Sequence, residues 1–484
     1  MEGLRKKLGE LIAPAISVVI FCVIACMNLG QPIWYDEAYS AYIIRGSFSD
    51  IWQMTALDVH PPFYYFCLKI WTGLFGHSEF ALRSMSVFFA AVGLVLAYVL
   101  FRRWFGKRTA NLASFFMALS PFLVRYAQEA RMYGLVFAIV IGASLALDVA
   151  LKEKKKLAWF CYAILIALGM WTHYFAALAW IAHLLYIAYY LHEHGLRKDV
   201  FWMYPLAVFC FLPWLPTAIK QFLDVQNGFW IPEVSINTPV GIFTQGLMLE
   251  KPENVTDWRA FLLIATLCAV MALAIRKCSS IKAKDRKNVS FLSVMVAIPP
   301  LALIILSLPP FKPTFVARYV TYSIALMMGL IAYIVASPSK KRGRVYNIIA
   351  TMLILTCVGF GIAQTLSRSS NSATKDIIMR TEQASATTIL FDGDEMDDLD
   401  AFFYETDASP VYEVDIDFKW GALEPIRRYG QNYTEDINGL LADRSDFWYI
   451  VDKSFEKSIE FPGFSPETTL ENDQYLATYF KKTN

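Results

Sequence analysis

The sequence predicts an α-helical polytopic membrane protein with a small α/β domain at its C-terminal end. Of its 484 residues, 56% are hydrophobic and only 18% are charged, and the mean hydropathy is +0.41. That is more apolar surface than a water-soluble protein of ordinary composition carries. Apolar runs long enough to cross a bilayer recur up to about residue 366. From about residue 367 the pattern changes to short β-rich runs between polar stretches.

About eleven apolar runs approach the roughly 17 to 25 residues that a helix needs to span a bilayer. The first has a basic flank like a secretory signal, but it lacks a small-x-small cleavage site and further spans follow, so we expect a retained helix. The runs near 109–124 and 157–171 are the shortest. The predicted spans lie near 11–30, 81–101, 109–124, 132–151, 157–171, 174–191, 200–217, 258–275, 289–308, 316–336 and 345–366.

The distribution of Lys and Arg predicts the orientation of these spans. The N-terminal segment and the even-numbered connections carry 23 basic residues, whereas the opposite connections, with the adjacent Arg318, carry eight over a longer stretch of sequence. Basic residues in short loops accumulate on the cytoplasmic side. We therefore expect a multi-pass plasma-membrane protein with a cytoplasmic N-terminus and with the first loop, 31–80, outside.

The C-terminal segment predicts a separate extracytoplasmic domain. Runs such as TTILF, PVYEV and FWYIV alternate with DDLDAFFYE and ALEPIRRYG, a pattern of strands between helical or polar stretches. The acidic segment DGDEMDDLD lacks the Gly at position 6 and the Glu at position 12 of an EF-hand loop. We interpret its acids as residues at the start of a helix on a solvated surface. The predicted domains are a transmembrane module, 1–366, and a soluble α/β domain, 367–484.

The first outer loop concentrates polar side chains beside aromatic ones. WYDEAYSAY places Asp36 and Glu37 just after the first span, and DVHPPFYYF places Asp58 and His60 before a second aromatic segment. The two prolines disfavour helix at His60 and hold the loop extended. Acids near a membrane surface are often functional, but this pair also suits the first turn of an interfacial helix. Both interpretations remain open at the level of sequence.

These motifs resemble a known family. WYDEAYSA, DVHPPFYYF and ALRSMS are similar to the first lumenal loop of the dolichyl-phosphate-mannose protein O-mannosyltransferases and of the bacterial aminoarabinose transferases of lipid A. Both groups are membrane glycosyltransferases of the GT-C fold. SPFLVRYAQEARMYGL and FVARYV resemble later outer-face motifs of the bacterial branch, so the likeness extends over roughly residues 10 to 335.

The resemblance implies a role for each matched residue. It assigns the catalytic base to Asp36 with Glu37 in support. His60 stands where the aminoarabinose branch has lysine, which favours the mannosyltransferase-like side and leaves the sugar open. The substrate-binding candidates are Asp58, His60, Arg83, Glu129, Arg131 and Arg318.

The implied chemistry suits these residue types. A sugar on a polyprenyl phosphate has a good leaving group, so one base that takes the acceptor's hydroxyl proton is enough. Arg131, Arg318 or His60 would stabilise the departing phosphate. No cofactor is assigned, because no clear cluster of ligands for a divalent metal is visible in the sequence. The expected partners are a polyprenyl-phosphate-linked sugar, a hydroxyl acceptor on a protein, polymer or lipid, and membrane lipids, with no nucleic acid.

Plainer interpretations accompany these assignments. Glu129 and Arg131 are two residues apart and do not face each other on a helix, so either could serve structure or substrate. His173, in WTHYF, fits an aromatic belt at the membrane interface better than a metal site. A polyprenyl-linked sugar flippase is the alternative function, although no internal repeat is apparent. A non-catalytic assembly or sensor protein is a third class.

Overall fold

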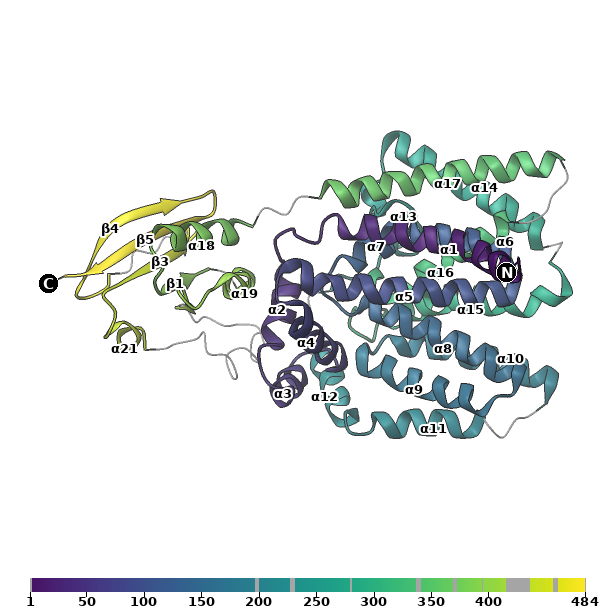
Figure 1. The fold of residues 1–484 in the computed structure, drawn as a ribbon, viewed down its shortest axis with the longest axis horizontal. Helices are drawn as coiled ribbons and strands as arrows, with labels where there is room; N and C mark the ends of the chain where they lie inside the picture. The colour runs from purple at the N-terminus through teal and green to yellow at the C-terminus, as the bar shows by residue number, and fades with distance from the viewer. Residues whose placement is uncertain are drawn as a thin grey trace. The chain divides into compact units, whose positions relative to one another are not determined.

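The computed structural model describes residues 2–195, 200–226, 231–278, 281–336, 341–368, 372–393, 395–414, 436–455 and 460–483. The chain divides into two compact units. A helical unit comprises residues 1–29, 59–64 and 83–368, and a second unit comprises residues 30–58, 65–82 and 369–484. The second unit therefore contains most of the first loop together with the C-terminal domain (Figure 1).

Each predicted span corresponds to one or two helices of the structure. Among the described residues, six helices are long and apolar enough to cross a membrane, or up to seven if one bent pair counts as a single span. Leu11–Cys26 and Lys156–Thr172 are shorter apolar helices. The polytopic helical prediction is thus confirmed, and the number eleven stays a prediction. The helices are α1 (Glu2–Cys26), α5 (Glu79–Phe105), α6 (Lys107–Ala118), α7 (Pro121–Ala127), α8 (Tyr133–Glu153), α9 (Lys156–Thr172), α10 (Ala176–His194), α11 (Val200–Phe211), α12 (Leu215–Gln226), α13 (Thr238–Met248), α14 (Asp257–Cys278), α15 (Ala283–Ile305), α16 (Thr321–Val335) and α17 (Lys341–Ser367), with short 3-10 turns η1 (Pro252–Asn254) and η2 (Ala317–Val320).

Two predicted spans are each divided into two helices. The run near 109–124 divides at Ser120, whose hydroxyl caps α7 by accepting from the backbone N–H of Leu123, with Pro121 as the first helical residue. The run near 200–217 divides between α11 and α12, whose axes differ by 75°. The second break turns α12 away from the line of α11.

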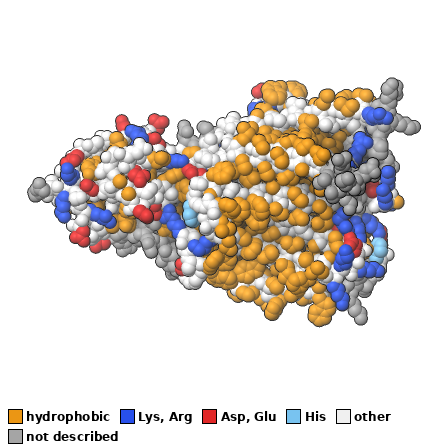
Figure 2. Space-filling model, viewed as in Figure 1, with side chains coloured by type: hydrophobic (Ala, Val, Ile, Leu, Met, Phe, Trp, Pro, Cys, Tyr) orange, Lys and Arg blue, Asp and Glu red, His pale blue; other side chains and the backbone are white. Residues whose placement is uncertain are grey.

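Apolar side chains cover the outside of the helical unit. Figure 2 shows hydrophobic atoms spread over its visible face, with Lys and Arg gathered at the end where α1 begins. Trp202, Phe209 and Phe261 are 72%, 70% and 76% exposed. A surface of this kind suits contact with lipid.

Close helix packing and buried ion pairs hold the helical unit together. A Cβ added at Gly134 would lie 2.4 Å from the carbonyl oxygen of Ser86, so only glycine allows α8 to approach α5 this closely. The buried carboxylate of Asp148 on α8 accepts from Arg103 Nε at 3.0 Å, Lys152 Nζ at 2.5 Å and Trp104 Nε1 at 2.7 Å. A buried acid with three donors is well satisfied.

Three helices form most of the first loop. α2 (Tyr35–Ile43) carries Asp36 and Glu37 in its first turn, and α3 (Phe48–Leu57) begins with a capping box in which Ser47 and Asp50 bond each other's backbone N–H. These hydrogen bonds lower the pKa of Asp50. α4 (Phe63–Phe75) follows the Pro61–Pro62 pair.

In its described residues, the C-terminal domain has a five-stranded mixed sheet with helices, and the sequence predicts a small α/β domain here. The strands are β1 (Ile389–Asp392), β2 (Val411–Glu413), β3 (Asp446–Asp452), β4 (Phe464–Glu471) and β5 (Tyr475–Lys482), in the order β2-β1-β3-β5-β4. β1 pairs in parallel with β2 and β3, and β5 is antiparallel to β3 and β4. The helices are α18 (Ala373–Ala384), α19 (Glu395–Tyr404) and the short α21 (Ile437–Leu441).

Strands β1 to β3 match the predicted runs TTILF, PVYEV and FWYIV, and DDLDAFFYE forms most of α19. The predicted segment ALEPIRRYG lies outside the described residues. The expectation that the acids of DGDEMDDLD are solvated is wrong for two of them: Asp392 and Asp398 are buried, and Asp392 accepts a hydrogen bond of 2.7 Å from the Tyr449 hydroxyl. They are buried because one ends strand β1 and the other lies on the inward face of α19.

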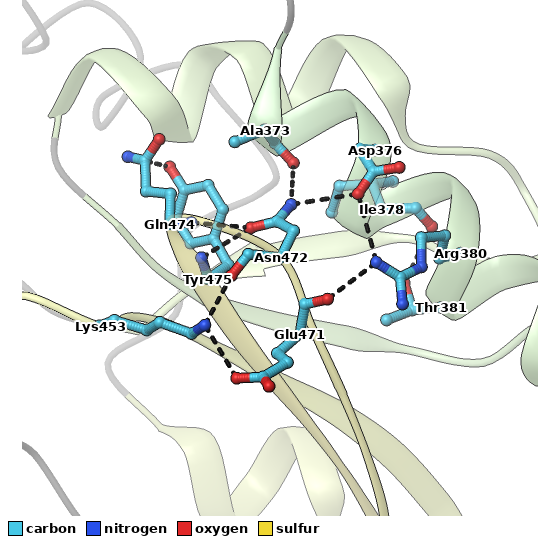
Figure 3. A network of polar contacts seen from close by, with 10 residues as sticks. All are labelled: Ala373, Asp376, Ile378, Arg380, Thr381, Lys453, Glu471, Asn472, Gln474 and Tyr475. Atoms are coloured by element: carbon cyan, nitrogen blue, oxygen red, sulfur yellow. Dashed lines mark hydrogen bonds and ion pairs between the residues drawn. The ribbon is translucent and has the colours of Figure 1, made fainter.

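A polar network ties α18 to the β4–β5 hairpin (Figure 3). The side-chain amide of Asn472 donates to the carbonyl of Ala373 at 2.8 Å, and its carbonyl accepts from the backbone N–H groups of Gln474 and Tyr475. Arg380 donates to the carbonyl of Glu471 at 2.8 Å. One asparagine therefore fixes both the hairpin turn and the start of the helix.

The second unit also joins α2 to the C-terminal domain. Arg45, just after α2, forms an ion pair of 2.5 Å with Glu405 and donates to the carbonyl of Phe402. The ring of Phe402 on α19 lies 5.7 Å from that of Tyr42 on α2. The two acids of α2 are thus carried by a helix that α19 supports.

Candidate functional site

Three basic candidates of the helical unit lie in connections rather than within long helices. His60 lies between α3 and α4 and is kept out of helix by Pro61 and Pro62. Arg131 lies in the turn between α7 and α8, and Arg318 lies in η2 before α16. Segments that are distant in sequence therefore supply the positive charge.

Arg131 and His60 meet directly. The Nη2 atom of Arg131 lies 3.4 Å from Nε2 of His60. Because arginine has no acceptor atom, a hydrogen bond between the two runs from Arg131 to Nε2 of His60, in the tautomer that carries its proton on Nδ1. In that tautomer His60 Nδ1 is a hydrogen-bond donor, and Arg131 keeps its full charge.

His173, between α9 and α10, lies at the centre of an aromatic group. Its ring lies 5.9 Å from His60, 5.0 Å from Tyr319 and 6.2 Å from Tyr133. Burial, reinforced by the neighbouring His60, Arg131 and Arg318, holds the pKa of His173 well below its ordinary value. The backbone N–H of Phe175 donates to its Nδ1 at 3.3 Å, which fits the neutral form. A residue buried in this way differs from the expected aromatic-belt residue at the membrane interface.

Arg318 approaches the same aromatic group from η2. Its guanidinium lies 5.9 Å from the centre of the Tyr133 ring, within the range of a cation–π contact. Glu129 forms its ion pair with Arg125, one helical turn earlier, at 2.8 Å. This pair is consistent with a structural role for Glu129, as the sequence left open.

A cavity of about 290 Å³ opens beside these residues within the helical unit. His60, His173 and Tyr319 lie along its wall, and apolar side chains such as Phe222 and Leu306 line most of the rest. Apolar cavities with a few polar groups at one place are typical of ligand sites. This one can accept a largely apolar ligand with an anionic group.

The break between α11 and α12 contributes to the cavity wall. Ala218, Gln221, Phe222 and Val225 of α12 line it. The side-chain carbonyl of the buried Gln221 accepts from the Tyr174 hydroxyl at 2.5 Å, and the Tyr174 oxygen accepts from Trp214 Nε1 at 2.7 Å. This chain of hydrogen bonds fixes α12 against the connection that carries His173.

The other candidates have different surroundings. Asp36 is half-buried and Glu37 is fully buried in the first turn of α2, and Asp58 ends α3. Arg83 on α5 is buried and donates to the carbonyl of Leu29 at 2.9 Å, which anchors the end of the first span. Within the described ranges, no three His, Cys, Asp or Glu side chains are arranged to hold a metal ion.

The sequence interpretation missed Tyr319, Phe175 and Gln221 as parts of the cavity. Tyr319 lies in the FVARYV motif directly after Arg318, and Phe175 follows His173 in WTHYF, so proximity to the named residues was the available signal. The Phe175 and Tyr319 rings stack with centres 4.9 Å apart. Gln221 carried no signal, because its place depends on the bend before α12.

Comparison with known proteins confirms the predicted resemblance. Residues 59–218 match the family described as dolichyl-phosphate-mannose-protein mannosyltransferase. No curated protein matches the chain in sequence.

Solved structures share the fold over nearly the whole chain. The crystal structure of ArnT from Cupriavidus metallidurans bound to undecaprenyl phosphate is 11% identical, covers 97% of both chains and has a TM-score of 0.62. The archaeal oligosaccharyltransferase AglB from Archaeoglobus fulgidus, in complex with an inhibitory peptide and a dolichol-phosphate, is 10% identical, with a TM-score of 0.52 over 92% of this chain and 70% of that one. This chain has the fold of these GT-C membrane proteins.

Proposed function

We propose that this chain is an integral membrane glycosyltransferase that moves a sugar from a polyprenyl-phosphate donor to a hydroxyl acceptor on the outer face of the membrane. One observation carries the proposal: three basic side chains from distant segments gather beside a largely apolar cavity in the helical unit. The family match over residues 59–218 and the shared fold with ArnT support the same activity.

The cavity suits a lipid phosphate rather than a sugar nucleotide. Its wall is mostly apolar, as the first isoprene units of a polyprenyl chain require. The lining residue His60 adds a polar group to the wall, next to Arg131. Arg131 and Arg318 are charged at every working pH and present planar donors that match phosphate oxygens. Preorganised positive charge stabilises the phosphate as its own charge grows during bond cleavage.

In the proposed reaction the acceptor oxygen attacks the anomeric carbon. The bond between that carbon and the phosphate oxygen breaks, and its electron pair leaves with the polyprenyl phosphate. Asp36 takes the hydroxyl proton as general base, and Glu37 and Asp58 shape its surroundings. The assignment of Asp36 rests on its place just after the first span and on the resemblance of WYDEAYSA to the family motif.

The remaining candidates have narrower proposed roles. Arg83 holds the segment that leads from α1 toward Asp36 by bonding the Leu29 carbonyl. Glu129, paired with Arg125, holds the connection that ends at Arg131. Both therefore serve substrate binding by positioning other residues.

The bend of 75° between α11 and α12 is the observation that favours the alternative function, a polyprenyl-linked sugar flippase. Broken helices that line a central site are typical of transporters. The two functions differ in one requirement: a flippase needs a sealed membrane, whereas a transferase acts in detergent.

The test supplies the purified protein in detergent with labelled polyprenyl-phosphate sugars, a panel of hydroxyl acceptors and, separately, soluble sugar nucleotides. We expect consumption of one lipid-linked sugar only. Arg318→Ala should lower its turnover roughly 10²- to 10³-fold, the scale for loss of one preorganised donor. Lys220→Ala is the matched control, since Lys220 is exposed on α12 and does not line the cavity. Equal use of a sugar nucleotide, or an unaffected Arg318→Ala variant, would contradict the proposal.

A further inference from the structure

A second, larger cavity lies between other helices of the helical unit. It encloses about 1170 Å³ and is lined by residues of α1, α6, α16 and α17, with the Ala336 turn. Ile16 of α1, Phe115 of α6 and Met352 and Leu355 of α17 give it apolar walls. We call it the α1–α17 groove. None of the residues assigned to the candidate functional site lines it.

The charged residues of the α1–α17 groove are both basic. Arg108 lies near the start of α6 and Arg344 near the start of α17, and no acidic residue lines the groove. In the part of the chain that the structure describes, Arg108 makes no ion pair, whereas the nearby Arg103 is paired with both Asp148 and Glu153. Among the described residues, the groove wall therefore carries basic but no acidic side chains.

The polar side chains near the two arginines add a second feature. Asn111 lies one turn after Arg108, and its buried side-chain oxygen has no hydrogen-bond partner among the described residues. An unpaired buried acceptor is costly, so a ligand that donates a hydroxyl proton to it would bind more favourably. Phosphatidylglycerol has such hydroxyl groups next to an anionic phosphate.

The location of the groove fits an inner-leaflet lipid. Arg108 and Arg344 belong to the basic connections FRRWFGKR and SPSKKRGR, which the charge bias predicts to be cytoplasmic. Anionic lipids of the cytoplasmic leaflet are recognised by basic pockets between transmembrane helices. We infer that the α1–α17 groove binds one anionic glycerophospholipid, with its phosphate between Arg108 and Arg344 and its acyl chains along α1 and α17.

The experiment uses the purified full-length protein, delipidated in detergent and offered equimolar phosphatidylglycerol and phosphatidylcholine with the same acyl chains. Native mass spectrometry then counts each retained lipid. We expect the protein to retain one phosphatidylglycerol in preference to phosphatidylcholine. The double variant Arg108→Gln/Arg344→Gln should lose this retention on the order of tenfold, because each basic residue near a lipid phosphate contributes substantially to its binding. The control Lys156→Gln/Lys284→Gln removes two exposed lysines of the same predicted side that do not line the groove.

A second variant tests the groove without changing charge. Thr351→Phe places a ring among the lining residues of α17 and should also abolish retention of the lipid. Excess polyprenyl phosphate should not displace the phosphatidylglycerol, since the proposed donor cavity lies elsewhere. Equal retention of both lipids, equal loss in the lysine control, or displacement by polyprenyl phosphate would overturn the inference and leave the proposed transferase activity untouched.

Discussion

The positive charge beside the proposed donor cavity comes from Arg131 and Arg318, and different contacts hold these two side chains. Arg131 is oriented by the imidazole of His60, and Arg318 by the face of the Tyr133 ring. Both contacts leave the guanidinium charged. A charged guanidinium presents planar donors that match phosphate oxygens.

The first prediction at this scale concerns the proposed base. Asp36→Asn keeps the size of the side chain but cannot accept a proton at neutral pH, so transfer should fall roughly 10²-fold or more. Binding of the lipid donor should persist, because the proposed phosphate contacts are made by other residues. Asp407→Asn, an exposed acid of the same unit, is the control. Transfer and donor binding are measured in one preparation of each variant. Near-normal transfer in Asp36→Asn, or loss of folding together with donor binding, would indicate that Asp36 is a helix-capping residue rather than the base.

The second prediction concerns pH and His173. Its pKa is depressed below the ordinary value of 6.5, so the folded protein holds this imidazole neutral. As the pH falls below that value the unfolded chain binds a proton first, and stability that is complete above it is progressively lost. The apparent melting temperature should therefore fall between about pH 7.5 and about pH 5.5.

The variant His173→Gln should show a smaller fall over the same interval, whereas His77→Gln, at an exposed position of the first loop, should behave as the wild-type protein does. Parallel pH profiles for the wild type and His173→Gln would show that His173 does not contribute to the pH dependence.

At the scale of elements, α2 depends on α19 for its position. The Phe402 side chain is 2% exposed and contacts Tyr42, and Arg45 bonds both Glu405 and the Phe402 carbonyl. The backbone N–H of Ile33, just before α2, donates to the Tyr404 hydroxyl at 2.9 Å. One short helix of the C-terminal domain thus holds both ends of the helix that carries Asp36 and Glu37.

Phe402→Ala should loosen α2. Removing a buried phenylalanine side chain costs about 3 to 5 kcal/mol in a well-packed core. We expect faster hydrogen exchange of the α2 amides and a lower kcat, with the donor KM little changed. Met379→Ala, at a 43% exposed position of α18, is the control. Unchanged exchange in α2, or a loss confined to donor KM, would contradict a positioning role for α19.

At the scale of the whole molecule, the prediction concerns topology. The bias of 23 basic residues against eight places residues 276–287 inside and the C-terminal domain outside. Reporter fusions after Lys284 and after Ser370 should therefore report opposite compartments. The same compartment for both fusions would mean that the number of spans between them is even, against the prediction.

The sequence by itself determined the membrane class, the approximate positions of the long apolar helices, and strands β1 to β3. Length and apolarity of a run are properties of contiguous residues, so α5, α8 and β3 follow from local pattern alone. The motifs around Asp36, His60 and Arg318 were also visible, because each is a short string of letters.

Tertiary structure alone decided which of these residues meet. Arg131 and His60 are 71 positions apart, and nothing local in either segment specifies their contact of 3.4 Å. Gln221 reaches the cavity because α11 and α12 differ in direction by 75°, and Asp392 is buried because Tyr449 of a neighbouring strand covers and bonds it. Burial and long-range contacts depend on how elements pack, which a periodic pattern does not encode. Much of the secondary structure could therefore be predicted from the sequence, whereas the cavity and the charged side chains around it are set by the tertiary fold.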